Sequence, residues 1–224
     1  MATEKRFVCL ANSRKLGGRC IAGIEMSQTG EPLGWLRPVS AFGHGEISLY
    51  DQRYSDGSGP HVLDIVSVTL LEPRPKDYQQ ENWLLDSSSH LSKVGALGWD
   101  EVEQLADQHE KLWINDSHTV KGYYDSISLD LAKSLTSSLR LIRVSKLTLS
   151  VFNYYNKRRV QGRFRHAGIL YWLWVTDPMY EEPYKAKDDG NYELGECLLT
   201  ISLSEPLEER NECYKLIAAI IPRP

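Results

Sequence analysis

The sequence predicts a mainly β protein with short helices, organised as two small barrels joined by a helical connector. Three observations lead to this fold class. Short β-branched, aromatic and aliphatic runs fill the first 75 residues, a stretch of helical periodicity follows, and strand-like runs return after Arg140. We expect the first barrel over residues 1–85, the connector over 86–138 and the second barrel over 139–224.

The first barrel is expected from four strand-like runs that are separated by turn residues. They lie at residues 6–11, 19–26, 34–39 and 62–72. Between the first two runs, Gly17 and Gly18 can adopt the positive φ of a two-residue hairpin turn. Residues 12–19 are therefore predicted to form a basic hairpin tip.

The connector is predicted from helical spacing. Trp99, Val102 and Leu105 recur with a helical period, with acidic residues near the start of the segment and basic ones near its end. A second short helix is expected at residues 129–139.

The second barrel is predicted from five further runs. They lie at residues 140–155, 160–166, 169–176, 196–204 and 214–222. Alternation places Gln161, Arg163 and Arg165 on one face of their strand. The first run is too long for one straight strand, and its pattern slips near Ser145 and Lys146, where a small barrel needs a bulge.

Composition bounds the class of protein. The chain has 224 residues and is 42% hydrophobic, which is enough to build folded cores. We find no apolar run long enough for a signal peptide or a membrane span, so we expect a cytoplasmic protein without membrane contact. The four cysteines show no CxxC spacing and are predicted to be reduced and structural.

Charge is strongly segregated along the chain. Residues 131–176 contain nine Lys and Arg and no Asp or Glu, whereas the other 178 residues carry 17 basic and 30 acidic groups. Such a local positive field attracts a polyanion even though the formal net charge is −4. Because the segment is also rich in aromatic residues, nucleic acid is the first partner to test.

A binding surface is predicted where these cations meet aromatic rings. Its residues are Arg140, Arg143, Lys146, Tyr154, Tyr155, Lys157, Arg158, Arg159, Arg163 and Arg165, with Trp172 or Trp174 nearby. Guanidinium groups suit phosphates, and aromatic faces suit the bases of a single strand. The alternative is that the aromatic residues belong to the core and the arginines form a solvated face.

A second candidate site lies in the first barrel. An anion or small ligand is expected near Ser13, Arg14, Lys15, Arg19, Trp35 and Arg37, because small residues let backbone amides approach an anion. The alternative is a solvated hairpin tip. Arg37 needs either an external anion or a structural partner, for which Asp64 is the candidate.

Catalytic and metal chemistry receive little support. Cys20 could act as a nucleophile with His44 as base, but it lies in an apolar strand-like run. The six histidines lack metal-ligand spacing, and the acidic residues Glu181, Glu182, Asp188 and Asp189 are interpreted as a solvated loop, with a divalent ion as the minor alternative. We therefore expect no catalytic residue, metal or cofactor.

Several phrases resemble the bacterial family described as a dual OB-containing domain. They are ANSRK at 11–15, GRCIAG at 18–23, GWLRPVS at 34–40, LDIV at 63–66, QQEN at 79–82 and VTDP at 175–178. The resemblance spans nearly the whole chain and includes no catalytic signature. It implies two OB-like barrels, a nucleic-acid-related role alongside bacterial defence or repair machinery, and an inter-strand site in the first barrel.

These observations favour a non-catalytic protein that binds single-stranded or structured DNA or RNA. Two alternatives stay open. One is a nucleotide or small-ligand sensor or enzyme with its site at the hairpin of residues 12–19 and Arg37. The other is an interaction module that docks an acidic protein partner on the basic face.

Overall fold

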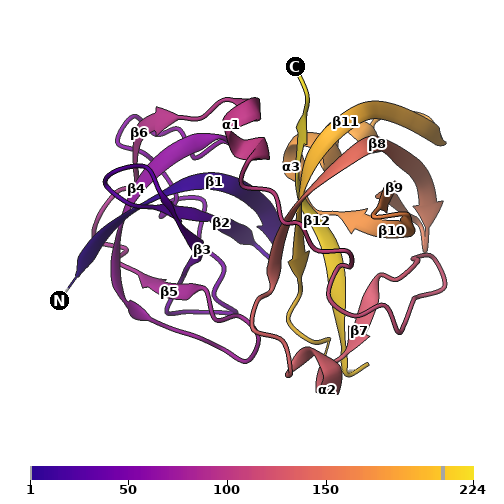
Figure 1. Ribbon diagram of the computed structural model, residues 1–224, viewed down its shortest axis with the longest axis horizontal. Helices are drawn as coiled ribbons and strands as arrows, with labels where there is room; N and C mark the ends of the chain where they lie inside the picture. The colour runs from indigo at the N-terminus through magenta and orange to yellow at the C-terminus, as the bar shows by residue number, and fades with distance from the viewer. Residues whose placement is uncertain (1, 208–209) are drawn as a thin grey trace. The chain divides into compact units, whose positions relative to one another are not determined.

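The structure, a computed structural model, describes residues 2–207 and 210–224. The chain forms two compact units, Met1–Leu105 and Ala106–Pro224, and most of each unit is β-sheet (Figure 1). The predicted mainly β fold is confirmed.

The first unit contains six strands and one short helix. They are β1 (Thr3–Lys15), β2 (Gly18–Met26), β3 (Pro32–Val39), β4 (Asp64–Pro73), β5 (Asn82–Leu85), β6 (Ser92–Ala96) and α1 (Trp99–Glu103). Each of the four predicted runs overlaps one of β1 to β4. The two strands that were not predicted, β5 and β6, are four and five residues long.

Strand pairing closes the first sheet into a barrel. β1 pairs with β2, β2 with β3, β3 in parallel with β5, β5 with β4, and β4 returns to β1. This strand order, 1-2-3-5-4, is that of an OB-fold, the five-stranded Greek-key barrel. Alternate side chains such as Phe7, Cys9 and Ile21 fill the barrel core.

The predicted hairpin between β1 and β2 exists, but its turn differs from the prediction. Lys15 pairs with Gly18, and Leu16 adopts the positive φ, 48°, which Gly17 and Gly18 do not. Gly18 is required for another reason, because a Cβ there would lie 2.4 Å from the backbone oxygen of Ile47. The assignment of positive φ to the two glycines was therefore wrong.

The second unit contains six strands and two helices. They are β7 (Ser126–Ser128), α2 (Leu129–Ala132), β8 (Leu139–Tyr154), β9 (Lys157–His166), β10 (Ile169–Val175), α3 (Pro178–Lys185), β11 (Gly190–Leu203) and β12 (Glu212–Pro222). All five predicted strand-like runs overlap β8 to β12. The helix expected at 129–139 is shorter, because α2 ends at Ala132 and β8 begins at Leu139.

The second sheet closes in the same order as the first. β8 pairs with β9, β9 with β10, β10 in parallel with β12, β12 with β11, and β11 returns to β8. Helix α3 lies between the third and fourth strands of this barrel in the sequence. The fold is therefore two OB-like barrels, one in each unit.

The long strand β8 is irregular at the predicted place. Its pairing with β11 shifts between Leu147 and Val144, opposite Gly195, which has a positive φ of 66°. The shift spans Ser145 and Lys146 and lets one long strand curve around the barrel. The predicted irregularity of this strand is confirmed.

The helical connector expected at residues 86–138 is not confirmed. Its two helices have only five and four residues. Strand β6 of this region instead belongs to the first sheet, where it pairs with β4, and β7 belongs to the second sheet, where it pairs with β12. The proposed boundaries at residues 85 and 138 stay a prediction.

Candidate functional site

The outer face of strands β8, β9 and β10 in the second barrel brings cations and aromatic rings together. Strand register places Trp172 opposite Arg163, Trp174 opposite Gln161, and Phe152 opposite Arg159. The intervening residues, such as Phe164 and Leu173, point into the barrel core. We call the following side chains the outer face: Thr148, Ser150, Phe152, Tyr154, Lys157, Arg159, Gln161, Arg163, Arg165, Leu170, Trp172 and Trp174.

A first group of rings lies near the β8–β9 turn. The centroid of the Trp174 ring is 5.9 Å from that of Phe152 and 6.1 Å from that of Tyr154. Tyr155 packs against Tyr154 at 4.5 Å and is 83% exposed. Tyr155 and Asn156 both have positive φ, as a type I′ turn requires, so the turn itself presents the Tyr155 ring to solvent.

A second group of rings lies around Trp172. The guanidinium of Arg163 sits 4.3 Å from the Trp172 ring centroid, and the centroid of the Tyr123 ring lies 6.2 Å from it, with the two rings tilted against each other. His118 stacks on Tyr123 at 5.8 Å. Trp172 and Trp174 are both half-buried, whereas Tyr171, which points to the other face of β10, is fully buried.

Four cations of the outer face form no ion pair with a carboxylate among the residues that the structure describes. Lys157 and Arg159 make no side-chain hydrogen bond there, and the Arg163 guanidinium lies over the Trp172 ring. Arg165 donates a hydrogen bond to the backbone oxygen of Gly168 at 2.9 Å and is exposed. Within the described residues, no acidic group neutralises these four charges.

Other cations of the predicted surface are already paired with carboxylates. Arg143 contacts Glu196 at 2.5 Å, Lys146 contacts Glu193 at 2.6 Å, and Arg158 pairs with Asp189. Hydrogen bonds from Arg223 and Arg143 lower the pKa of Glu196. The sequence segment 131–176 has no acid of its own, but the partners come from β11 and the segment before it.

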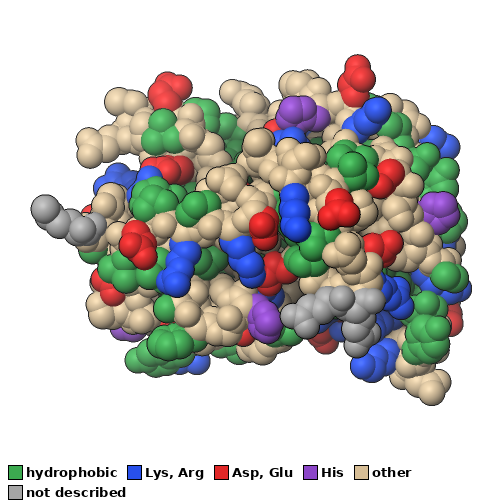
Figure 2. Space-filling model, turned by 90° about the horizontal axis from the view of Figure 1, so that it is seen from below, with side chains coloured by type: hydrophobic (Ala, Val, Ile, Leu, Met, Phe, Trp, Pro, Cys, Tyr) green, Lys and Arg blue, Asp and Glu red, His purple; other side chains and the backbone are tan. Residues whose placement is uncertain are grey.

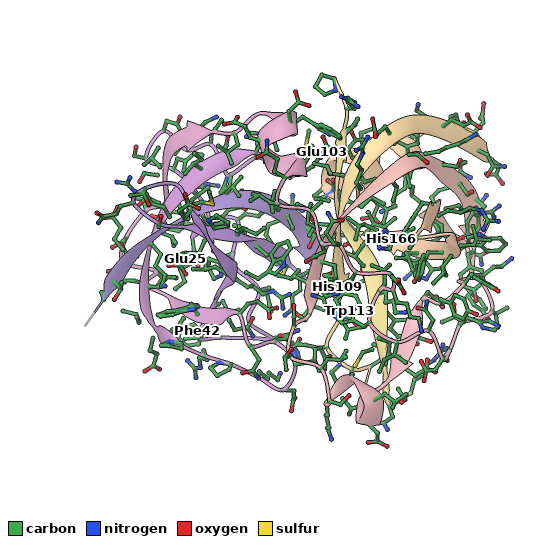
Figure 3. All side chains as sticks on the ribbon, in the orientation of Figure 1. Glu25, Phe42, Glu103, His109, Trp113 and His166 are labelled. Atoms are coloured by element: carbon green, nitrogen blue, oxygen red, sulfur yellow. The ribbon has the colours of Figure 1, made fainter. Side chains whose placement is uncertain are left out.

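Arg140 is placed away from the outer face by its contacts. Its guanidinium lies 5.6 Å from the ring of Trp113, which is labelled in Figure 3. Trp113 in turn donates a hydrogen bond to the backbone oxygen of Ser137 at 2.9 Å. Arg140 is therefore the member of the predicted surface for which the structure shows a packing role.

Residues 117–125 bring further side chains to the outer face that the sequence did not reveal. The Lys121 ammonium lies 5.8 Å from the ring centroids of both Phe152 and Tyr154. Tyr123 is hydrogen-bonded through its backbone to Trp172 on β10. The signal in the sequence was weak, since only Gly122 marked the segment as a loop.

Figure 2 shows Lys and Arg side chains gathered beside hydrophobic ones over part of the second unit. Basic and acidic side chains are otherwise interspersed on that face of the molecule.

The predicted anion site of the first barrel is only partly assembled. Arg14 lies opposite Arg19 in the register of the hairpin strands, and the Lys15 ammonium donates a hydrogen bond to the backbone oxygen of His44. Ser13 is buried and Trp35 is half-buried. The structure brings these hairpin residues together, but Arg37, which is buried, pairs with a carboxylate of the same barrel.

Arg37 forms a buried ion pair with Glu81 at 3.0 Å. Its expected partner Asp64 instead contacts Lys93 at 2.5 Å and accepts hydrogen bonds from Tyr54 and from the backbone of His61. The predicted Arg37–Asp64 pair was therefore wrong. A buried charge needs a close partner. Pairing of β3 with β5 places Arg37 opposite Asn82, and this brings Glu81, the residue before β5, close to Arg37.

The outer face of the first barrel differs in chemistry from that of the second. Between the core residues of β1 and β2, the alternate side chains are Val8, Leu10, Ala22 and Ile24, all of which are buried. These four side chains offer no cation and no ring. The middle of β1 and β2 therefore differs from the outer face of the second barrel.

The minor chemical alternatives find no support. Cys20 and His44 make no contact with each other within residues 2–207 and 210–224. The same residues contain no group of three or more His, Cys, Asp or Glu side chains that could hold a metal ion. Glu181 and Glu182 lie in α3 rather than in a loop, and Lys185 pairs with both of them.

No described helix combines the length and apolar character needed to span a membrane.

The comparisons with known proteins agree with this architecture. No curated protein and no solved structure matches the chain significantly. The family model of the dual OB-containing domain matches residues 5–220, which include both barrels. The chain therefore belongs to the dual OB-containing domain family.

Proposed function

We propose that the protein binds single-stranded nucleic acid on the outer face of β8, β9 and β10. The observation that supports this proposal is the nearness of cations to half-buried rings on one face: Arg163 lies over the Trp172 ring, and Arg159 lies opposite Phe152 in the strand register. In OB-folds, the second and third strands and the loops beside them are the common oligonucleotide site, and here these strands are β9 and β10.

The rings favour a single strand over a duplex. A base of a single strand can stack flat on Trp172, Trp174 or Tyr155, which contributes roughly 1–3 kcal/mol per base. The bases of a duplex are stacked on one another and offer only their edges and the backbone. A protein that used only backbone contacts would need cations but no exposed rings.

The rival sites are less well supported. A nucleotide site at Arg37 would have to displace Glu81, whose side chain is as buried as that of Arg37 at 5% exposure. An acidic protein partner would use the cations of the outer face but would not depend on stacking. Loss of affinity on Tyr155→Ala, with the cations intact, therefore distinguishes nucleic acid from such a partner.

The proposal is tested by oligonucleotide binding measured as fluorescence anisotropy. We expect Arg159→Gln and Arg163→Gln each to weaken binding of a single-stranded oligonucleotide and to reduce the salt dependence by about 0.7 per lost phosphate contact. The matched control is Arg143→Gln, because Glu196 already neutralises Arg143. Equal effects of all three variants, or no oligonucleotide binding by the wild type, would refute the proposal.

The finer details of the function remain part of the proposal. We infer a non-catalytic, cytoplasmic protein that acts alongside bacterial defence or repair machinery, as the family resemblance suggests. Whether DNA or RNA is bound is decided by comparing the two oligonucleotides of equal sequence in the same assay, because only RNA offers a 2′-hydroxyl.

A further inference from the structure

Residues 117–125 begin at the edge of β10 and reach across part of the outer face. Tyr123 exchanges backbone hydrogen bonds of 3.2 Å with Trp172, as an antiparallel bridge at the edge of β10. Two residues earlier, the backbone oxygen of Lys121 accepts a hydrogen bond of 2.5 Å from the side-chain amide of Gln161 on β9. The segment thus lies beside β10 at Tyr123 and over β9 at Lys121, which explains why Gln161 is only 1% exposed although it points outward.

The crossing segment separates the rings into two groups that do not touch each other among the described residues. Phe152, Tyr154, Tyr155 and Trp174 form one connected group. His118, Tyr123 and Trp172 belong to the other. We call these the Trp174 station and the Trp172 station. Lys121 reaches over the first station, whereas Tyr123 is part of the second.

The segment is held in a fixed shape by a buried carboxylate. Asp125 is fully buried and accepts hydrogen bonds of 2.7 Å from both the backbone amide and the hydroxyl of Thr119. The Thr119 hydroxyl accepts a further bond from the amide of Gly122. A Cβ at Gly122 would lie 1.7 Å from a carboxylate oxygen of Asp125, so only glycine fits there.

A further contact ties the preceding chain to the same sheet. His166 at the end of β9 donates a hydrogen bond of 2.6 Å from Nε2 to the backbone oxygen of His109; both residues are labelled in Figure 3. The chain is therefore connected to β9 at His109, ahead of the crossing segment, to β9 again at Lys121, and to β10 at Tyr123.

We propose that residues 117–125 divide the outer face into two stacking stations, so that the protein selects a strand long enough to bridge them. This inference rests on the proposed function. Trp172 and Trp174 are two residues apart on one strand, which separates their Cα atoms by roughly 7 Å. A bound strand stacks at least one base on each station and passes its backbone over the segment, where Lys121 neutralises a phosphate.

The first test compares thymidine monophosphate with a twelve-nucleotide oligothymidylate, a length within the roughly 4–16 nucleotides of an OB-fold site. We expect Trp172→Ala and Trp174→Ala each to weaken binding of the long strand by about 5- to 150-fold. The mononucleotide has a single base and can occupy one station only, so we expect one of the two variants to leave its binding unchanged. Equal losses in both variants for both ligands would overturn the two-station arrangement.

The second test changes the segment without touching a ring or a cation. Gly122→Ala forces Asp125 and the segment apart, and we expect it to weaken binding of the long strand by at least about tenfold while the mononucleotide is bound as before. The matched control is Gly17→Ala in the other barrel, where a Cβ meets no atom within 4 Å. Thr119→Val, which removes two of the hydrogen bonds, provides the same test if Gly122→Ala lowers the melting temperature.

The outcomes separate the two proposals. If no oligonucleotide binds the wild type, the proposed function fails and the two-station inference fails with it. If the long strand binds but Gly122→Ala and Thr119→Val, both folded, bind it as tightly as the wild type, the proposed function stands and the two-station inference is overturned.

Discussion

Arg158 and Arg159 are neighbours in the sequence, but strand alternation points them to opposite faces of β9. Arg158 donates to the backbone oxygens of Lys185 and Lys187 and pairs with Asp189, so it holds the segment between α3 and β11. Arg159 makes no such contact among the described residues. Arg158 therefore stabilises the fold, whereas Arg159 is assigned to the proposed binding.

This division predicts opposite outcomes for two matched variants. We expect Arg158→Ala to lower the free energy of unfolding by about 1 kcal/mol, because three acceptors lose a charged donor at a partly exposed site. Arg159→Ala is expected to leave the melting temperature unchanged and to weaken oligonucleotide binding. Thermal unfolding and anisotropy check the pair; a stable Arg158→Ala variant with reduced binding would reverse the assignment.

Lys215 is a fully buried cation inside the second barrel. Its ammonium nitrogen donates to the backbone oxygen of Ile114 at 2.7 Å and to the side chain of Asn115 at 2.9 Å. Burial lowers the pKa of Lys215 from 10.5 to about 7, because desolvation outweighs the attraction of Asp116 and Asp125.

The lowered pKa makes stability depend on pH. Between pH 7 and 10.5 the unfolded chain binds a proton at Lys215 that the folded chain does not, so stability rises with pH in this window, by at most about 1.4 kcal/mol per unit. Below pH 7 both states are protonated and the contribution is constant. We expect Lys215→Met to flatten the rise, as measured by urea unfolding across this pH range. An unchanged slope would contradict a lowered pKa.

The hairpin that joins β1 and β2 illustrates how an element can tolerate an unfavourable residue. Leu16 holds a left-handed backbone with φ of 48° and is 64% exposed, so its side chain gains little from packing. The left-handed region is disfavoured for a residue with a Cβ by roughly 1–2 kcal/mol.

Relief of this strain is expected to stabilise the first barrel. Leu16→Gly removes the steric conflict but adds backbone freedom to the unfolded chain, so we expect a net gain of about 0.5–1 kcal/mol in the free energy of unfolding. The measurement is chemical denaturation. Gly17→Ala is the control at the neighbouring turn position, and a loss of stability in Leu16→Gly would show that the leucine side chain matters for packing.

Strands β8 to β10 could be predicted because alternation is a local property. The sequence placed Arg163 and Arg165 on one face, and the register pairs Arg163 with Thr148 and Trp172, and Arg165 with Leu170. The short strands β5, β6 and β7 could not be found in the same way, because three to five residues carry no clear period. They form only because long neighbours offer them hydrogen-bonding partners.

The charge distribution of the chain bounds how tightly nucleic acid is held. Five cations reach the outer face without a carboxylate partner among the described residues: Lys121, Lys157, Arg159, Arg163 and Arg165. At about 0.7 per phosphate, the logarithm of the affinity should fall with the logarithm of salt at a slope no steeper than about −3.5. Anisotropy titrations at several salt concentrations measure this slope, and a steeper one would require a second binding surface.

The sequence alone was sufficient for the properties that depend on neighbouring residues: two β-rich units, the bulge of β8, and the concentration of positive charge in residues 131–176. Pairing between distant segments was decided only by the tertiary structure, because closure of each barrel sets which strands become neighbours. That closure brought Glu196, Glu193 and Asp189 to three of the expected cations, and it brought Lys121 over β9 and Tyr123 to the edge of β10. The number of charges and aromatic rings in a segment is therefore a property of the sequence. Whether a charge is neutralised depends on which partners the fold brings within a few ångströms.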